Sequence, residues 1–228
     1  GASDPLTVTL YVNNILSTTI DQPLTLDYAT DALTTPSVVS QVGSTGYTPS
    51  EPGATASGLS WNLSANPLYA VEAMTATLLT GADPALTQSQ VTTLTATLVY
   101  SDAVAGETRT LSQTIPVLVD LDQPSSTITS PADGEAVNGT AYVIGGTATD
   151  PTSWPRLVET RVSGGGYDSG WQAASGATTW AWTWTPLPAD GVYTVQSRAT
   201  DYVYNVQSAP ATSSVIVDNT APGAGFSN

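Results

Sequence analysis

Apolar and small polar side chains alternate along most of the extended segments of the chain. The alternation is seen in residues 6–12 (LTVTLYV), 156–163 (RLVETRVS) and 192–198 (VYTVQSR), where every second residue falls into the same set. Successive side chains of a β-strand point to opposite faces, so this period predicts strands with one buried face. Clusters of Gly, Pro, Asn and Asp separate the segments and predict turns. The pattern therefore predicts an all-β fold.

The second half of the chain has seven such segments within ~100 residues and shows no helical period. Turn signals recur between the segments, among them Asp133-Gly134 and Asn138-Gly139. Short strands with regularly spaced turns are typical of an immunoglobulin-like sandwich. The expected strands are residues 126–131, 141–150, 156–163, 171–175, 178–186, 192–201 and 209–218.

The first half predicts another set of strands, less regularly spaced. Strand-like segments are residues 6–12, 19–30, 57–64, 69–79 and 90–120, the last with a hairpin at SDAVAGETRTLS. Residues 34–58 are rich in Pro, Gly and Ser, so we expect a loop-rich middle there.

Two matching junctions set the expected domain boundaries. VLVDLDQP (residues 117–124) and VIVDNTAP (residues 215–222) share Val-x-Val-Asp-x-x-x-Pro. Proline removes a ladder donor and fixes φ, so each motif is interpreted as a last strand and a short linker; the alternative is a chance match. We expect two tandem immunoglobulin-like β-sandwiches, residues 1–122 and 123–222, joined by a short Pro-containing linker. Residues 223–228 would begin a further module or form a tail.

The composition excludes several kinds of chemistry. The chain has no His, Cys or Lys, and its basic residues are Arg109, Arg156, Arg161 and Arg198. Nucleophile systems and zinc sites built on His or Cys, and Lys-dependent phosphate loops, are thereby excluded. The carboxylates are scattered among turns, so we expect no enzyme. A net charge of −15 argues against nucleic acid and anionic membrane surfaces. No apolar run is long enough to span a bilayer.

Residues 125–222 resemble the bacterial immunoglobulin-like domains of large cell-surface proteins. The resemblance rests on TITSPADGEAVNGT, GTATD, GGGYDSGWQAASGATTWAWTWTPLPADGVYTVQSRATD and VDNTAP. One loop departs from the family pattern, because the usual ATD-x-AGN is ATDYVYN here, at residues 199–205. The first half is similar to conserved-repeat immunoglobulin-like surface domains in LTVTL, QPLTLDY, WNL and ATLVYSD. The resemblance implies a location outside the cell, with neighbouring immunoglobulin-like domains of the same chain or fibre as partners.

Three tryptophans, Trp180, Trp182 and Trp184, fall on one face of the strand expected at 178–186. They are either part of the core or a platform on which sugar rings stack. A platform would turn Ala181 and Thr183 inward, and these side chains are too small to fill a core. We therefore expect a mainly buried row. Trp184, beside a turn, and Trp154, in a loop, are the candidates for exposed aromatic rings that bind cell-surface glycans.

Carboxylates suggest calcium at the domain junction. In an immunoglobulin order of strands, the loops with Asp150 and Asp201 lie at the pole where the linker with Asp120 and Asp122 arrives; Asn205 could add its amide oxygen. Crowded carboxylates require a cation or wide separation, and calcium takes 6–8 oxygen ligands. The resemblance also implies calcium at such junctions. The alternative is that these aspartates are turn and cap residues.

The sequence thus predicts a non-catalytic structural module of a bacterial extracellular or cell-surface protein, acting as a stalk, spacer or adhesin repeat. One alternative is a subunit of a surface filament, in which residues 5–12 (PLTVTLYV) or the C-terminal tail complete a neighbour's sheet. The other alternative is a carbohydrate-binding module that uses exposed tryptophans.

Overall fold

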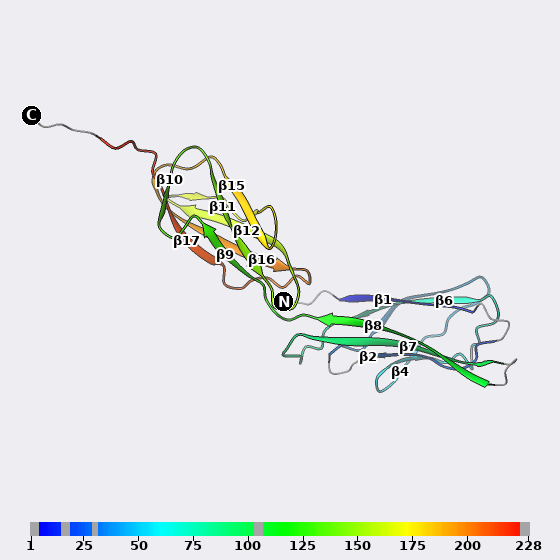
Figure 1. Ribbon diagram of the computed structural model, residues 1–228. Helices are drawn as coiled ribbons and strands as arrows, with labels where there is room; N and C mark the ends of the chain where they lie inside the picture. Colours follow the sequence, from blue (N-terminus) through cyan, green and yellow to red (C-terminus); the bar gives the residue numbers. More distant parts are fainter. Residues whose placement is uncertain (1–4, 15–18, 29–31, 103–106, 224–228) are drawn as a thin grey trace, which may run out of the picture. The chain divides into compact units, whose positions relative to one another are not determined.

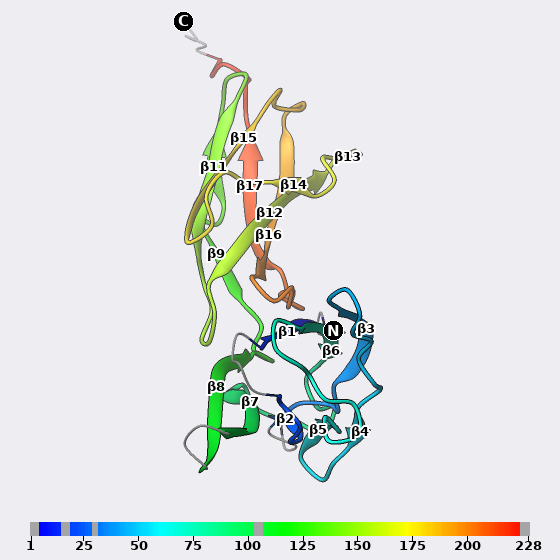
Figure 2. The ribbon, with the colours of Figure 1, turned by 90° about the vertical axis from the view of Figure 1, so that its right-hand side faces the viewer.

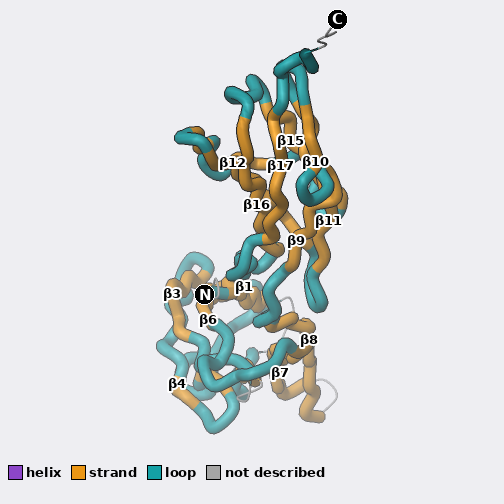
Figure 3. Tube along the Cα trace, turned by 90° about the vertical axis from the view of Figure 1, so that its left-hand side faces the viewer, coloured by secondary structure: helices purple, strands orange, loops and turns teal. Residues whose placement is uncertain are grey.

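The computed structural model describes residues 5–14, 19–28, 32–102 and 107–223, and it omits the side chains of residues 101 and 102. The chain forms two compact units, residues 2–120 and residues 121–228. The described residues contain strands and no helix, so no helix among them could cross a membrane. The predicted all-β fold with tandem β-sandwiches is confirmed (Figures 1 and 3). The division falls two residues before the expected boundary.

The first unit is built from two sheets of unequal width. One sheet has the order β1-β6-β3 and the other the order β4-β5-β2-β7-β8, and all pairs are antiparallel. The strands are β1 (Leu6–Asn13), β2 (Leu24–Tyr28), β3 (Ser37–Gly43), β4 (Gly53–Ala54), β5 (Gly58–Trp61), β6 (Ala73–Thr80), β7 (Gln90–Asp102) and β8 (Glu107–Val119).

Strand β3 lies inside the segment that was expected to be a loop-rich middle, and that prediction was wrong for residues 37–43. Val38, Val39 and Val42 favour an extended backbone, and β3 pairs with β6 along its length, with one irregularity after Val38. The Pro and Gly residues around β3 concealed this short strand.

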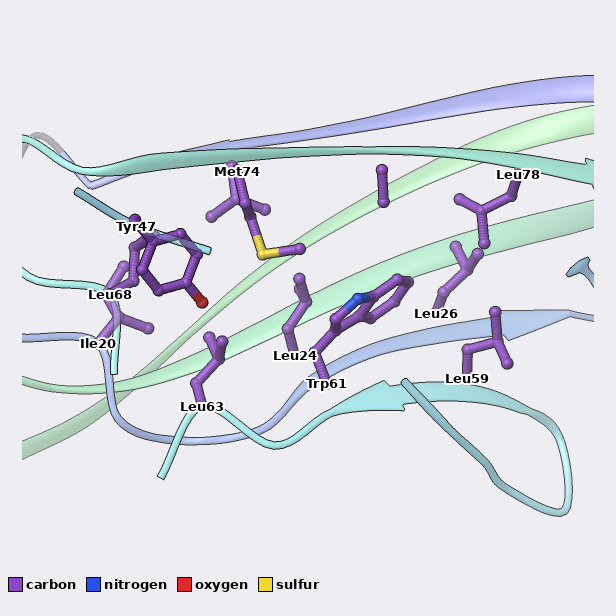
Figure 4. Packing of buried hydrophobic residues seen from close by; sticks show 12 residues of the cluster. Ile20, Leu24, Leu26, Tyr47, Leu59, Trp61, Leu63, Leu68, Met74 and Leu78 are labelled. Atoms are coloured by element: carbon purple, nitrogen blue, oxygen red, sulfur yellow. The ribbon is translucent and has the colours of Figure 1, made fainter. Parts of the chain in front are cut away.

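The core of the first unit lies between its two sheets and centres on Trp61. This indole is fully buried among aliphatic side chains such as Leu24, Leu26 and Met74 (Figure 4). Its Nε1–H donates to Oε1 of Gln41, 2.7 Å away on β3, so β5 of one sheet is bonded to β3 of the other. A buried indole needs such an acceptor, and here the acceptor also ties the two sheets together.

The second unit has the strand order of an immunoglobulin-like sandwich (Figure 2). One sheet is β15-β11-β9 and the other is β10-β17-β16-β12-β13, with β14 also paired to β12. The strands are β9 (Ser125–Ser130), β10 (Glu135–Val137), β11 (Tyr142–Thr149), β12 (Pro155–Gly164), β13 (Tyr167–Asp168), β14 (Gln172–Ala173), β15 (Thr179–Trp184), β16 (Gly191–Asp201) and β17 (Ala211–Val217).

The first strand of the second unit is divided between the two sheets. Its first part, β9, pairs with β11, and its second part, β10, crosses to the other sheet and runs parallel to β17 with Glu135 opposite Val215. The chain enters near Ser125, opposite Thr149, and β17 ends at Val217, opposite Gly191. Entry and exit therefore lie at opposite ends of this sandwich. Most of the predicted tail, residues 224–228, lies outside the described residues.

Candidate functional site

The tryptophan row of β15 belongs mainly to the core of the second unit. Trp180 is 2 % exposed, Trp184 is fully buried and Trp182 is half-buried, whereas Ala181 and Thr183 face outward. The Nε1–H of Trp180 donates to the carbonyl oxygen of Thr147 on β11, at 3.2 Å. The expectation that this row is core is confirmed, and the row does not form an exposed platform.

Trp184 corrects one part of that expectation, because it is not partly exposed. Its ring meets Tyr193 edge-on at 5.6 Å between centroids, and its Nε1–H donates to the hydroxyl of Tyr167. Tyr193 in turn donates its hydroxyl proton to the carbonyl oxygen of Ala189. The Tyr167 ring of β13 and the Tyr193 ring of β16 pack against Trp184 and bury it, although Trp184 lies next to a turn.

Trp154, the other candidate ligand-binding residue, has an exposed ring. Its side chain is 71 % exposed in the loop between β11 and β12. Beside it lies a hollow of about 480 Å³ whose lining includes Thr147, Thr149, Asp150 and Thr178. The structure thus agrees with the prediction that the Trp154 ring is exposed. Glycan binding by this ring stays a prediction.

Asp150 lies at the end of the second unit where the chain enters. Its Oδ1 accepts backbone N–H bonds from Thr152 at 2.9 Å and Ser153 at 2.6 Å, which shapes the loop after β11. Its Oδ2 is buried and makes no hydrogen bond among the described residues. A buried carboxylate oxygen without a donor is costly, because the charge is then neither solvated nor paired.

Asp201 ends β16 at the same end of the unit and is fully buried. Its Oδ1 accepts the backbone N–H groups of Val203 and Asn205, and its Oδ2 accepts the Asn205 side-chain amide at 2.9 Å. This carboxylate organises the loop that resembles the ATD-x-AGN pattern. The Asn205 side chain therefore turns toward Asp201, as a donor to it.

Asp150 and Asp201, which come from different loops, meet as predicted. A carboxylate oxygen of one lies within 4.8 Å of a carboxylate oxygen of the other. Two negative charges at this separation, both partly removed from water, repel strongly unless a cation lies between them. Carboxylate oxygens are also the ligands that calcium prefers. The arrangement is therefore suited to a hard divalent cation.

The linker carboxylates have separate partners. Asp122 accepts the Thr152 hydroxyl proton, which holds the entering chain to the loop that carries Asp150. The neighbouring Gln123 accepts the backbone N–H of Ser208 at 3.1 Å. Asp120 ends the first unit, where it is buried and accepts a hydrogen bond from the Ser89 hydroxyl.

The loop that departs from the family pattern contains a strained residue. Tyr204 stands where the pattern has Gly, and its φ is +68°, in the left-handed region that disfavours side chains. The guanidinium of Arg156 lies 4.4 Å from the centre of the Tyr204 ring, a cation–π contact that offsets part of this cost. The ATDYVYN sequence shows that Tyr204 replaces the Gly of the family pattern. The strain itself is seen only in the positive φ of Tyr204 in the structure.

The other arginines of the second unit also have partners within it. Arg198 donates to Glu159 at 2.8 Å and lies over the ring of Trp171. Arg161 forms a two-bonded ion pair with Asp168, which lowers the pKa of that carboxyl to about 2. These ion pairs neutralise Arg161 and Arg198 within the sheet that contains β12 and β16.

The exit end of the second unit contains a site that the sequence did not reveal. Asp190, in the turn before β16, accepts the backbone N–H of Asn219 at 2.7 Å and the hydroxyl of Thr220. These donors lower the pKa of Asp190, with the Thr220 hydroxyl as the largest cause. The Asn219 side chain accepts the backbone N–H of Gly139 in turn. The one sequence feature that points to this site is the Asp of the PADG turn at residues 188–191, and an Asp is equally common in turns that are simply exposed to solvent.

Comparison with known proteins gives limited similarity. No family model and no curated protein matches the chain. An engineered protein is 24 % identical, with 42 % of this chain and 20 % of its own length covered and a TM-score of 0.34. A putative membrane anchored protein from Corynebacterium diphtheriae is 13 % identical over 96 % of this chain and 51 % of its own, with a TM-score of 0.29. The major pilin subunit of Bacillus cereus is 8 % identical over 96 % of this chain and 71 % of its own, with a TM-score of 0.30.

The chain thus spans about a fifth of the length of the engineered protein and about half of that of the corynebacterial protein. Similarity of this extent assigns no function to the chain.

Replacing a tryptophan by alanine should separate core from surface rings. Trp184→Ala removes a fully buried ring and should lower the free energy of unfolding of the second unit by about 3–5 kcal/mol. Trp154→Ala, the matched control, should change it by no more than about 0.5 kcal/mol. Thermal unfolding followed by near-ultraviolet circular dichroism measures both. Equal losses in the two variants would contradict the assignment of Trp184 to the core.

Proposed function

We propose that this chain is a non-catalytic structural module of a bacterial cell-surface protein, where it acts as a stalk or spacer. The observation that carries the proposal is that the second unit holds the chain at both of its ends. Asp122 and Gln123 are bonded to its loops where the chain enters, and Asn219 and Thr220 where it leaves. A segment fixed in this way keeps a defined direction relative to the sandwich, whereas a flexible linker samples many directions.

The strand arrangement supports a mechanical role. Entry and exit lie at opposite ends of the sandwich, and the 11-residue strand β16 spans about 36 Å between them. A pull on the two ends loads β9 against β11, and β10 and β17 against their neighbours, along the strands. The ladder bonds must then yield together, because every bond of a ladder loaded along its strands carries part of the force.

The charge distribution fits a module exposed to solvent and repeated along a surface chain. The net charge of −15 keeps such chains soluble and mutually repelling. The resemblance of residues 125–222 to bacterial surface domains supports a role outside the cell, as a stalk, a spacer or an adhesin repeat. Strand β1 is paired with β6 of its own unit along its whole length, which favours the stalk over a filament in which residues 5–12 are donated to a neighbour.

Calcium at the entry end of the second unit is part of this proposal. Asp150 and Asp201 offer close carboxylate oxygens, and the orphaned Oδ2 of Asp150 fits a metal ligand. The linker brings Asp122 to the same loop through Thr152. A bound cation would neutralise these acids and stiffen the entry.

The hold on the exit segment can be measured directly. Asp190→Ala removes the acceptor for Asn219 and Thr220, so NMR order parameters of their backbone amides should fall from about 0.85 to below about 0.6. Asp168→Ala, which removes a carboxylate of the β12–β13 hairpin, is the control and should leave them unchanged.

The same hold should depend on pH in a defined direction. The pKa of Asp190 is lowered in the folded chain, so the carboxylate form persists below the ordinary aspartate value of about 3.9. The hold is therefore present above that value and is lost only as the pH falls through the lower, folded pKa. Disorder of Thr220 in the wild type at neutral pH would contradict a fixed exit.

Calcium should stabilise the second unit through Asp150. If the site binds as extracellular modules do, with a Kd of about 0.1 mM, then about 1 mM calcium adds roughly 1.4 kcal/mol to the free energy of unfolding. Asp150→Asn keeps the Oδ1 acceptor for Thr152 and Ser153 and removes the charge, so it should abolish the calcium effect. Asp133→Asn, an exposed acid elsewhere in the unit, should keep the effect.

Chelator makes that experiment decisive. Without calcium, Asp150→Asn should equal or exceed the wild type in stability, because it relieves the repulsion with Asp201. Thermal unfolding with and without calcium checks both statements. An unchanged wild-type melting temperature would contradict the calcium site, and so would a variant that is much less stable in chelator, since the charge would then serve the fold alone.

A further inference from the structure

The two sheets of the first unit leave part of its core-facing surface uncovered. The sheet β1-β6-β3 has three strands and faces one of five, β4-β5-β2-β7-β8. Strands β1 and β8 are the free edges on one side, since β1 pairs only with β6 and β8 only with β7 among the described residues. The narrower sheet therefore ends before it covers β8.

The uncovered surface is mainly apolar, with Gln113 as the polar residue between Leu111 and Ile115 on β8. On β8, every second residue from Leu111 to Val119 belongs to one face; Val119 is buried in a core cluster, yet Ile115 is 41 % exposed and Leu111 is 57 % exposed. One face of β8 is thus buried at its Val119 end and exposed to solvent toward Leu111. An inward row of large apolar side chains that meets water is a mark of a binding surface.

Two adjoining hollows form a groove between β1 and β8. Their volumes are about 360 Å³ and 310 Å³, and they share Leu10, Tyr11, Ala96 and Gln113 in their lining. The β1 edge is one wall, the inward face of β7 is the floor, and Leu111 and Ile115 of β8 belong to the opposite wall. Among the residues that the structure describes, no charged residue lines either hollow. We name this surface the β1–β8 groove.

The edge of β1 has none of the features that protect exposed edges. Its eight residues, LTVTLYVN, include no Pro, no Gly and no charge, and no irregularity interrupts its pairing with β6. Edge strands normally carry such features because a bare edge pairs with other chains. Strand β8, by contrast, contains Glu107, Arg109 and Pro116. The bare edge of β1 is thus the one that accepts a strand, and β8 supplies the apolar surface beneath it.

We propose that the β1–β8 groove binds an extended segment of a partner protein, which adds to β1 as an antiparallel strand and covers Leu111 and Ile115. Its inward side chains are apolar at alternate positions, and it carries Lys or Arg rather than acids. Charge decides between partners: residues 1–120 hold seven Asp and three Glu against one Arg, and the whole chain has no Lys. A second copy of this chain is repelled, whereas a basic strand is attracted.

A labelled eight-residue peptide tests the proposal on the full chain. The probe is KTVTVTVK, with KTTVVVTK as the control for pattern and ETVTVTVE as the control for charge. Fluorescence anisotropy should show binding of the first peptide at least about tenfold tighter than of either control. Hydrogen exchange should slow for the backbone amides of β1 when the first peptide is bound.

Paired variants on β8 locate the site. Leu111→Arg places a charge in the groove and should weaken binding by about tenfold or more, since one buried leucine contact is lost. Leu118→Arg makes the same change on the opposite face of β8, where Leu118 is 44 % exposed, and should alter binding less than twofold. Both side chains are exposed, so we expect both variants to fold, and circular dichroism of each variant checks this.

Three results would overturn the proposal. Equal binding of the basic and acidic peptides would remove the charge argument. Equal effects of the two arginine variants would place the peptide elsewhere. Self-association in sedimentation that Leu111→Arg abolishes would make a second copy, and not a basic partner, the occupant of the groove.

Discussion

A buried indole must find an acceptor for its single N–H, and the tryptophan positions of both sandwiches depend on this constraint. Trp61 meets it across the first sandwich, with Gln41 of the facing sheet. Trp180 meets it with a carbonyl oxygen of the neighbouring strand, and Trp184 with the hydroxyl of Tyr167. Each bond fixes the position of a large ring, and the aliphatic core packs around these rings. These three rings are consequently part of the core and are not available as a sugar platform.

Much of this fold could be predicted because strand alternation is a local property. The period of two identified most strands, and the small outward residues Ala181 and Thr183 showed which face of the tryptophan row is buried. The meeting of Asp150 and Asp201 followed from the order of strands in an immunoglobulin-like sandwich, which brings their two loops to one end. These predictions required only chain order and the geometry of a single sheet.

Other features depend on how elements pack, and the sequence could not show them. The burial of Trp184 arises from rings of two other strands, and the hold of Asp190 on Thr220 joins segments that are 30 residues apart. Strand β3 was hidden among prolines and glycines. The β1–β8 groove depends on a difference in width between two sheets, and no property of β8 alone distinguishes its open residues from its buried ones.

The two units therefore suggest different tasks within one chain. The second unit bonds the chain at both of its ends and is proposed to bear load along its strands, whereas the first has an open side that we propose as a site for an added strand. The most direct test of the mechanical role is single-molecule pulling of the full chain. Because the chain has no cysteine, the force can be applied through either of two introduced cysteine pairs, each in its own variant. Pulling through residues 121 and 221, which flank the bonded residues 122, 123, 219 and 220, loads the terminal strands along their length, and pulling through residues 192 and 216, which are opposite each other on β16 and β17, opens that ladder one pair at a time. We predict a higher unfolding force for the first pair. An equal or lower force would contradict a load-bearing role for this sandwich.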